Sequence, residues 1–326
     1  MISLSALDVA PGTRERLALT IPADVDAGDL SLPLLVARGA HEGPTALVLG
    51  GVHGDEPEGI SAASACWRDV DPQALHGMLL VLPQANLPAW QSGTRVSGID
   101  GRNLARSFPG RPDGSVTERI AHLISGLIRE SNVLIDLHSA GLHYAMPFLA
   151  GAYAADDALG QRCTAAALAF GAPVFWAHPD IAPGRSLSVA VEHGVVNVYV
   201  ECGGGGRVRR AHYDAYREGV RRVLGACGLL PRLPEPPPPE LRLRSTGDLD
   251  TWLSADVPGL LLEQVGLLDR VHTGDVLGTI VDPGDGSVLQ QVQAPFDGVV
   301  VMLRRTARVD VGDGVCMIAL PESPVR

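Results

Sequence analysis

Short, continuously apolar runs alternate with stretches of helical periodicity over most of the chain before residue 230. The apolar runs are TALVLGG (45–51), GMLLVLPQ (77–84), NVLIDLHS (132–139), a run near 173–177 and VVNVYVE (195–201). A strand that is apolar along its whole length belongs in a sheet covered on both faces, because neither of its sides can face water. The alternation therefore predicts an α/β sandwich.

The predicted helices lie between these strands, at about 57–67, 115–130, 155–170, 186–193 and 211–226. The second of them begins with a capping box, because Ser115 and Glu118 are three residues apart at its start. Apolar residues then repeat at helical spacing, which predicts one buried face. These residues are Ile120, Leu123, Ile124, Leu127 and Ile128.

A proline run, RLPEPPPP at 232–239, interrupts this pattern. Such a run favours extended polyproline geometry and cannot join a helix or a strand ladder. We interpret 232–241 as a linker between a catalytic domain at 1–231 and a small C-terminal all-β domain at 242–326. The alternative is an ordered strap on the surface. After the run, short strands separated by Gly/Asp turns predict a small barrel or sandwich, with a structural or substrate-gating role.

Composition excludes several function classes. The net charge of −11 argues against binding to nucleic acid or to an anionic membrane. The chain contains no lysine, which rules out a Schiff-base lysine and a phosphate-binding P-loop. The five cysteines are scattered, the N-terminus has no signal-peptide pattern, and no apolar run is long enough to span a membrane. We expect a reducing, cytoplasmic setting.

Polar side chains gather where three of the predicted strands end. His53 and Glu56 follow the first strand, His138 follows the third, and Glu201 ends the strand near 195. Ligands of open α/β sheets bind outside the carboxyl ends of the strands. Two histidines, one carboxylate and an open position are what a hydrolytic zinc ion requires. We do not expect Asp136, two residues before His138, to be the hydrogen-bond partner of that histidine.

Four segments carry a resemblance to a known family. GGVHGDEPEG, DGRNLARSFPG, DLHS and VYVECGGGG occur in this order, and together they resemble the succinylglutamate desuccinylase/aspartoacylase family. Among its members, the likeness is greatest to the N-acetyl-diaminobutyrate deacetylases. The resemblance implies a zinc carboxypeptidase-like α/β/α sandwich with a mixed sheet, followed by the small β-domain.

The resemblance also implies roles for single residues. His53, Glu56 and His138 match the ligands of one Zn²⁺ per chain. Glu201 matches the general base, which takes a proton from water and passes it to the leaving amine. Arg95 matches an arginine that helps to stabilise the oxyanion. Arg106 matches an arginine that holds a substrate carboxylate, and Asn103 and Arg185 are further substrate-binding candidates.

Two positions depart from the pattern of the family. Where relatives have an asparagine next to the arginine, this chain has Ala105, and where many have a Leu-Arg pair, it has Leu187-Ser188. Arg185 either takes over that arginine's role or lies on the surface. Both departures concern substrate choice and leave the metal ligands intact. We interpret His178 and the other remaining histidines as ordinary residues and Cys202 as a small buried one.

The chain is thus expected to be a zinc-dependent amidohydrolase that cleaves a small N-acyl amino acid or N-acyl amine. Its partner is a small-molecule N-acyl substrate, with a homo-oligomer as an open possibility. One alternative is a zinc carboxypeptidase that acts on peptides. The other is a non-catalytic binding protein on the same fold.

Overall fold

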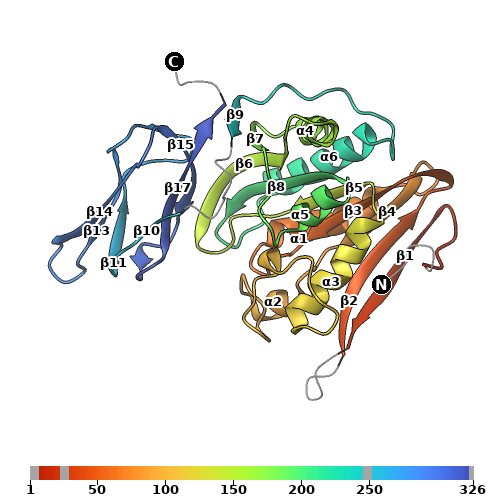
Figure 1. The fold of residues 1–326 in the computed structure, drawn as a ribbon, viewed down its shortest axis with the longest axis horizontal. Helices are drawn as coiled ribbons and strands as arrows, with labels where there is room; N and C mark the ends of the chain where they lie inside the picture. Colours follow the sequence, from red (N-terminus) through yellow and green to blue (C-terminus); the bar gives the residue numbers. More distant parts are fainter. Residues whose placement is uncertain (1–6, 23–28, 245–251, 323–326) are drawn as a thin grey trace.

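A computed structural model describes residues 7–22, 29–244 and 252–322 of the chain. Its centre is a mixed sheet with the strand order β1-β2-β4-β3-β5-β8-β6-β7-β9, which Figure 1 shows at the middle of the molecule. The strands β3, β4, β5 and β8 form its buried core. The bounds of the nine strands are β1 Thr13–Ile21, β2 Leu30–Arg38, β3 His41–Gly50, β4 His76–Leu82, β5 Val133–Leu137, β6 Tyr144–Tyr153, β7 Val174–His178, β8 Val196–Gly204 and β9 Leu241–Arg244.

Helices cover both faces of this sheet. α3 and α5 pack on one face, around Ile120, Ile124 and Leu187. α1, α4 and α6 pack on the other, around Ala62, Cys163 and Tyr216. The expected α/β sandwich with a mixed sheet is confirmed. The helix bounds are α1 Pro57–Asp69, α2 Leu87–Ser92, α3 Val116–Arg129, α4 Ala158–Phe170, α5 Ser186–Glu192 and α6 Arg210–Ala226.

The start of α3 follows the predicted capping box. The Ser115 side chain accepts a hydrogen bond from the Glu118 backbone, and the Glu118 side chain accepts one from the Ser115 backbone. These two bonds satisfy amide groups that have no partner inside the helix. The residues that follow place Ile120, Ile124 and Leu127 in the core, as the helical spacing predicts.

Four strands of the sheet, β1, β2, β6 and β9, had no counterpart in the sequence prediction. β1 and β2 pair antiparallel, and β2 pairs antiparallel with β4. β6 lies antiparallel to β8, between β8 and β7. This pairing also corrects the predicted end of β8. The strand continues to Gly204, so Glu201 lies inside it and not at its end, because β6 provides partners as far as Gly204.

The proline run is an ordered segment in the structure. Arg222 of α6 donates a hydrogen bond to the carbonyl oxygen of Pro234. The next strand, β9, pairs in parallel with β7 and so extends the central sheet. The division of the chain into domains stays a prediction, but the segment itself follows the surface beside α4 and α6 (Figure 1).

The C-terminal strands form an all-β unit, drawn in blue in Figure 1. One four-stranded sheet has the order β14-β13-β11-β16. The other strands continue the central sheet, because β17 pairs with β9 and β15 pairs with the start of β6. The strand bounds are β10 Leu253–Ser254, β11 Gly259–Glu263, β12 Arg270–Val271, β13 Val276–Val281, β14 Val288–Gln293, β15 Gly298–Arg304, β16 Arg308–Val309 and β17 Gly314–Pro321. None of the described helices is both long enough and apolar enough to cross a lipid bilayer.

Candidate active site

Three neighbouring parallel strands, β3, β5 and β8, position the polar residues predicted from the sequence. His53 and Glu56 lie in the loop between β3 and α1, and His138 comes directly after β5. The backbone amide of His138 donates to the carbonyl oxygen of Val200 at 2.9 Å, which places His138 beside Glu201. The carboxyl ends of these strands therefore bring the four side chains to one edge of the sheet.

The loop that carries His53 and Glu56 requires glycine at two positions. Gly51 has a φ of +65°, in the left-handed region that favours glycine. A Cβ on Gly54 would lie 2.0 Å from the carbonyl carbon of Ala89 at the start of α2. The loop packs closely against the start of α2. In this conformation the side chains of His53 and Glu56, three residues apart, point toward each other.

His53, Glu56 and His138 meet in a compact cluster. His53 Nδ1 is 2.7 Å from Glu56 Oε1, and His138 Nδ1 is 3.0 Å from Glu56 Oε2. One ligand atom from each residue lies within 4.8 Å of the other two. The side chains of His53 and Glu56 are 3% and 1% exposed, and that of His138 is 11% exposed. This is a candidate metal centre of two imidazoles and one carboxylate.

The outer nitrogen of each histidine faces an oxygen. His53 Nε2 is 3.2 Å from Asn103 Oδ1, and His138 Nε2 is 3.3 Å from Asp136 Oδ1. With a cation at Nδ1 in place of the hydrogen bond to Glu56, such contacts would hold the remaining proton of each ring on Nε2. The expectation for Asp136 was wrong, because residues two apart in a strand share a face. Ser186 of α5 donates a hydrogen bond to the other Asp136 oxygen.

The electrostatics of the cluster suit a bound cation. Burial and the charge of Arg95 lower the pKa of His53 to about 4, which keeps the ring neutral. Burial raises the pKa of Glu56, but the two histidines outweigh it and hold that pKa well below its usual range. Burial lowers the pKa of His138, but the carboxylates of Asp136 and Glu56 outweigh it and raise that pKa well above its usual range, so a metal would displace a proton from this ring. Neutral imidazole and ionised carboxylate are the forms that ligate a metal. The donor set therefore fits zinc.

Behind the cluster, a buried glutamate supports the loop that follows β5. Glu58 Oε2 accepts a hydrogen bond from Ser139 Oγ at 2.7 Å, and the Ser139 amide donates to Glu56 Oε2 at 3.1 Å. Tyr216 of α6 donates to the carbonyl oxygen of His138 at 2.7 Å. Cys202 is fully buried on this side, as predicted. These contacts hold the His138 backbone in place.

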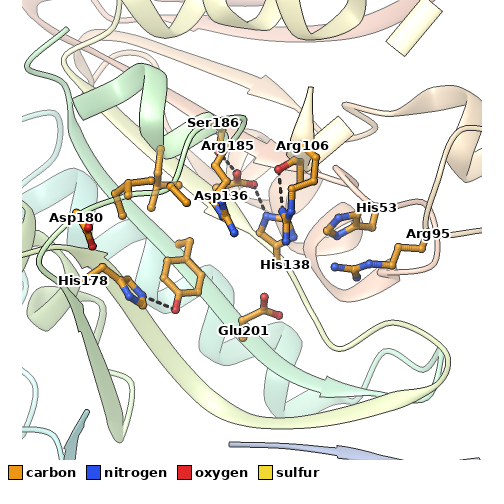
Figure 2. A pocket seen from close by; sticks show the side chains of 15 residues that line it. His53, Arg95, Arg106, Asp136, His138, His178, Asp180, Arg185, Ser186 and Glu201 are labelled. Atoms are coloured by element: carbon orange, nitrogen blue, oxygen red, sulfur yellow. Dashed lines mark hydrogen bonds and ion pairs between the residues drawn. The ribbon is translucent and has the colours of Figure 1, made fainter. Parts of the chain in front are cut away.

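Glu201 lies in the pocket next to this cluster (Figure 2). Its Oε2 atom is buried and has no hydrogen-bond partner in the described part of the chain. Burial is the largest influence and raises the pKa of Glu201 well above its usual range, even though His138 and Arg95 lower it. A carboxyl group held in this way keeps its proton to a higher pH than an exposed glutamate does.

The structure also brings three predicted arginines, Arg95, Arg106 and Arg185, to the wall of this pocket (Figure 2). Arg95 Nη1 is 2.9 Å from Glu56 Oε1, and its side chain is 42% exposed. Ala105 lines the pocket as well. Asn103 does not line it, because its Oδ1 atom accepts a hydrogen bond from the Ala105 amide and caps the short 3₁₀ helix Leu104–Arg106.

Sequence reasoning missed other residues of the pocket wall. His178 and Tyr199 are buried there and joined by a 2.8 Å hydrogen bond. Asp180 lies beside them (Figure 2). His178 was interpreted as an ordinary residue because no motif in the sequence pairs it with another polar residue. Tyr199 could have been found, because it lies two residues before Glu201 on the same strand and so shares its face.

The fold and the site together define a class of protein. It is a mixed α/β protein, with helices on both faces of the sheet, that carries a candidate His-Glu-His metal centre at the carboxyl edge. The family described as the succinylglutamate desuccinylase/aspartoacylase catalytic domain matches residues 42–227. The chain belongs to this family.

Similar proteins cover nearly the whole chain. It is 36% identical over 309 residues to an N-alpha-acetyl-L-2,4-diaminobutyric acid deacetylase of Halomonas elongata, covering 93% of this chain and 90% of that protein. The product-bound structure of the ectoine utilization protein EutE (DoeB) from Ruegeria pomeroyi superposes with a TM-score of 0.87 at 30% identity, covering 96% and 98% of the two chains. A succinylglutamate desuccinylase from Silicibacter sp. TM1040 gives a TM-score of 0.86 at 30% identity, covering 95% of each chain.

Proposed function

We propose that the protein is a zinc-dependent amidohydrolase that removes the acyl group from a small N-acyl amino acid. The observation that carries the proposal is the position of Glu201. Its carboxyl group lies in one pocket with His53 and His138, and one of its buried oxygens has no hydrogen-bond partner in the described part of the chain. A proton-exchanging carboxyl beside a metal-binding triad is the arrangement that hydrolysis of an amide requires.

In this proposal, His53, Glu56 and His138 hold the zinc ion through the atoms that already converge. Zinc, when bound there, supplies a Lewis acid that polarises the scissile carbonyl group and lowers the pKa of water. Asn103 and Asp136 fix the orientation of the two imidazole rings through their outer nitrogens. Such contacts contribute to metal affinity without touching the metal.

Glu201 moves the proton. Its carboxylate form accepts a proton from the attacking water, and the carboxylic acid then donates it to the nitrogen of the leaving amine. The raised pKa of Glu201 favours this exchange, because the acid form persists closer to neutral pH than for an exposed glutamate. Arg95 lies beside Glu56 at the open side of the pocket, where its guanidinium stabilises the developing oxyanion.

The pocket favours a small substrate that carries charges of both signs. Its cavity volume is about 120 Å³, which gives room for a small-molecule substrate. Arg106 and Arg185 offer positive charge to a carboxylate, and Asp180 offers negative charge to an amine. The deacetylase of Halomonas elongata is named for 2,4-diaminobutyric acid, which has both groups. We propose an N-acetyl diamino acid as the substrate.

A substrate panel tests this function. Zinc-loaded protein is incubated with N-acetyl-2,4-diaminobutyrate, other N-acyl amino acids and short peptides, and the release of free amine is measured. We expect hydrolysis of the N-acyl amino acids, loss of activity on chelation, and recovery with added Zn²⁺. Release of C-terminal residues from peptides instead, or no hydrolysis at all from protein with a full complement of zinc, would contradict the proposal.

A further inference from the structure

Tyr199 and His178 form a buried pair in the pocket that the reaction described above does not use. Tyr199 is 8% exposed and His178 is 1% exposed, and both line the pocket. The Tyr199 hydroxyl and His178 Nε2 are 2.8 Å apart, and Figure 2 marks this bond from His178. A tyrosine hydroxyl can donate one hydrogen bond, so the direction of this bond decides what Tyr199 offers to a ligand.

The backbone fixes the tyrosine ring in place. Tyr199 pairs with Asp136 of β5 on one side and with Gly151 of β6 on the other. A Cβ on Gly151 would lie 2.1 Å from the Tyr199 ring, so the ring occupies the space that a side chain on β6 would fill. The hydroxyl therefore stays on the pocket face, which Tyr199 shares with Glu201.

The histidine decides which way the hydroxyl proton points. Burial and the charge of Arg185 lower the pKa of His178 to about 3, so its ring is neutral and carries one proton. His178 Nδ1 is buried and has no hydrogen-bond partner in the described ranges. A proton on Nδ1 would be a buried N–H without an acceptor, which is rarer than an acceptor without a donor.

The favoured tautomer carries its proton on Nε2, which donates to the Tyr199 oxygen. The hydroxyl proton is then free to turn into the pocket and meet an oxygen atom of a ligand. Of the two charged groups of the proposed substrate, only the carboxylate accepts such a bond, because an ammonium group only donates. Arg185 lines the same part of the wall and supports a carboxylate there by its positive charge.

We propose that Tyr199 is a substrate-binding residue that donates a hydrogen bond to the substrate carboxylate, and that His178 is the positioning residue that sets the direction of this bond. The inference rests on the proposed function for the identity of the substrate. In this proposal the neutral Tyr199 hydroxyl acts together with the arginines in selecting a substrate that carries a carboxylate.

Two substrates that differ only in the carboxylate test the proposal. They are N-acetyl-2,4-diaminobutyrate and N-acetyl-1,3-diaminopropane, compared on wild-type protein and Tyr199→Phe. We expect Y199F to lose roughly ten- to a hundredfold in kcat/KM on the first substrate, mainly through KM, and little on the second. Tyr153→Phe is the matched control, because the Tyr153 hydroxyl bonds to Asp157 at the surface. It should leave both substrates unchanged.

An equal loss on both substrates, or no loss on either, overturns the role of Tyr199. His178→Phe should reproduce the selective loss, whereas His178→Gln, which keeps an N–H donor, should restore part of it. If H178F leaves the ratio of the two substrates unchanged, His178 does not set the direction of the bond. Thermal unfolding and zinc content of each variant show whether it is folded.

Failure of the proposed function is a separate outcome. If wild-type protein hydrolyses neither substrate, calorimetric binding of free 2,4-diaminobutyrate and 1,3-diaminopropane still tests Tyr199. Weaker binding of the carboxylate-bearing ligand to Y199F, with the diamine unaffected, supports the proposal in that case. Equal binding of both ligands to wild type and variant overturns it.

Discussion

At the scale of single residues, four side chains on two adjacent strands make up the inner wall of the pocket. Asp136 of β5 and Tyr199 of β8 are register partners. His138 follows Asp136 by two residues, and Glu201 follows Tyr199 by two residues. All four lie on one face of the sheet, because side chains alternate along a strand with a period of two. A proton-exchanging group and a metal-binding group are thereby held side by side.

Glu201→Gln separates proton transfer from metal binding. Glutamine has nearly the same shape as glutamate but cannot accept and return a proton. We expect turnover to fall by at least ~100-fold, while zinc content stays at the wild-type level because Glu201 is not one of the three converging ligands. Amine release and metal analysis on the same sample measure both effects.

Glu192→Gln is the matched control, because Glu192 is exposed at the end of α5. It should retain wild-type activity. A fully active E201Q enzyme would show that the proton moves through another group.

His178→Gln should change how stability depends on pH. The pKa of His178 is about 3 in the folded protein, against 6.5 for an ordinary histidine, so the unfolded chain takes up the proton first. The stability that the neutral ring provides is complete above about pH 6.5 and is lost as the pH falls from there toward 3. H178Q should therefore lose stability less steeply on acidification, by up to about 1.4 kcal/mol per pH unit.

Urea unfolding at pH 7, 6 and 5 measures this slope. The control is His143→Gln, which changes an exposed histidine in the loop before β6 and should run parallel to wild type. Parallel curves for H178Q and wild type would contradict the assignment of a buried neutral ring.

The three predicted metal ligands could be found from sequence because each follows an apolar run at a strand end. The structure brings all three together, and their role as ligands stays a proposal. Asp136, Tyr199 and His178 were not found in this way. Asp136 and Tyr199 lie inside strands, where polar residues among apolar ones are easily read as part of the core, and only the register shows that they face the pocket.

At the scale of elements, α3 stabilises one face of the central sheet. Its capping box and its buried row, which includes Ile120, Ile124 and Leu127, join the N-terminal hairpin to the core. Ser115→Ala removes the side-chain oxygen that accepts from the Glu118 amide. We expect a loss of about 1 kcal/mol in the free energy of unfolding, with unchanged activity. Denaturant unfolding and amine release measure the two.

Ser31→Ala is the control for this change, because Ser31 is an exposed serine on β2 without a capping role. Its stability should stay within about 0.5 kcal/mol of wild type. A loss of activity in S115A comparable to its loss of stability would show that α3 contributes to the site.

The elements that the sequence predicts are those with a clear pattern of apolar residues, either a continuous run or a helical spacing. The buried parallel strands and the long amphipathic helices belong to this group. β1 was missed because its exposed residues dominate TRERLALTI, an outer strand of the sheet. β6 was missed because it contains a proline and a glycine, and that glycine makes room for the Tyr199 ring. The contact between β6 and the Tyr199 ring of β8 thus explains why a glycine, which weakens the strand pattern of the sequence, stands in β6.

At the scale of the whole molecule, strand pairing continues from the central sheet into the C-terminal unit. β15 pairs with β6, β17 pairs with β9, and Tyr144 packs against Trp252 with ring centroids 4.8 Å apart. The residues that line the pocket come from positions 53 to 201, so the described residues of the C-terminal unit, 252–322, contribute none of them.

We expect the continuous sheet to unfold in one cooperative transition. Breaking the pairs between β9 and β17 would expose backbone groups and apolar surface on both sides at once. Scanning calorimetry should give one peak whose calorimetric enthalpy equals the van't Hoff enthalpy. Two resolved peaks, with activity lost only in one of them, would show that the two parts unfold separately.

The pairing of β5 with β8 has a further consequence for how a ligand is received. Both strands lie at the centre of the sheet, with partners on either side and helices on both faces. The spacing between His138 and Glu201 is therefore set by backbone geometry before any substrate arrives. Little reorganisation remains to be done during the reaction, so compounds shaped like the tetrahedral transition state should find a site already complementary to them.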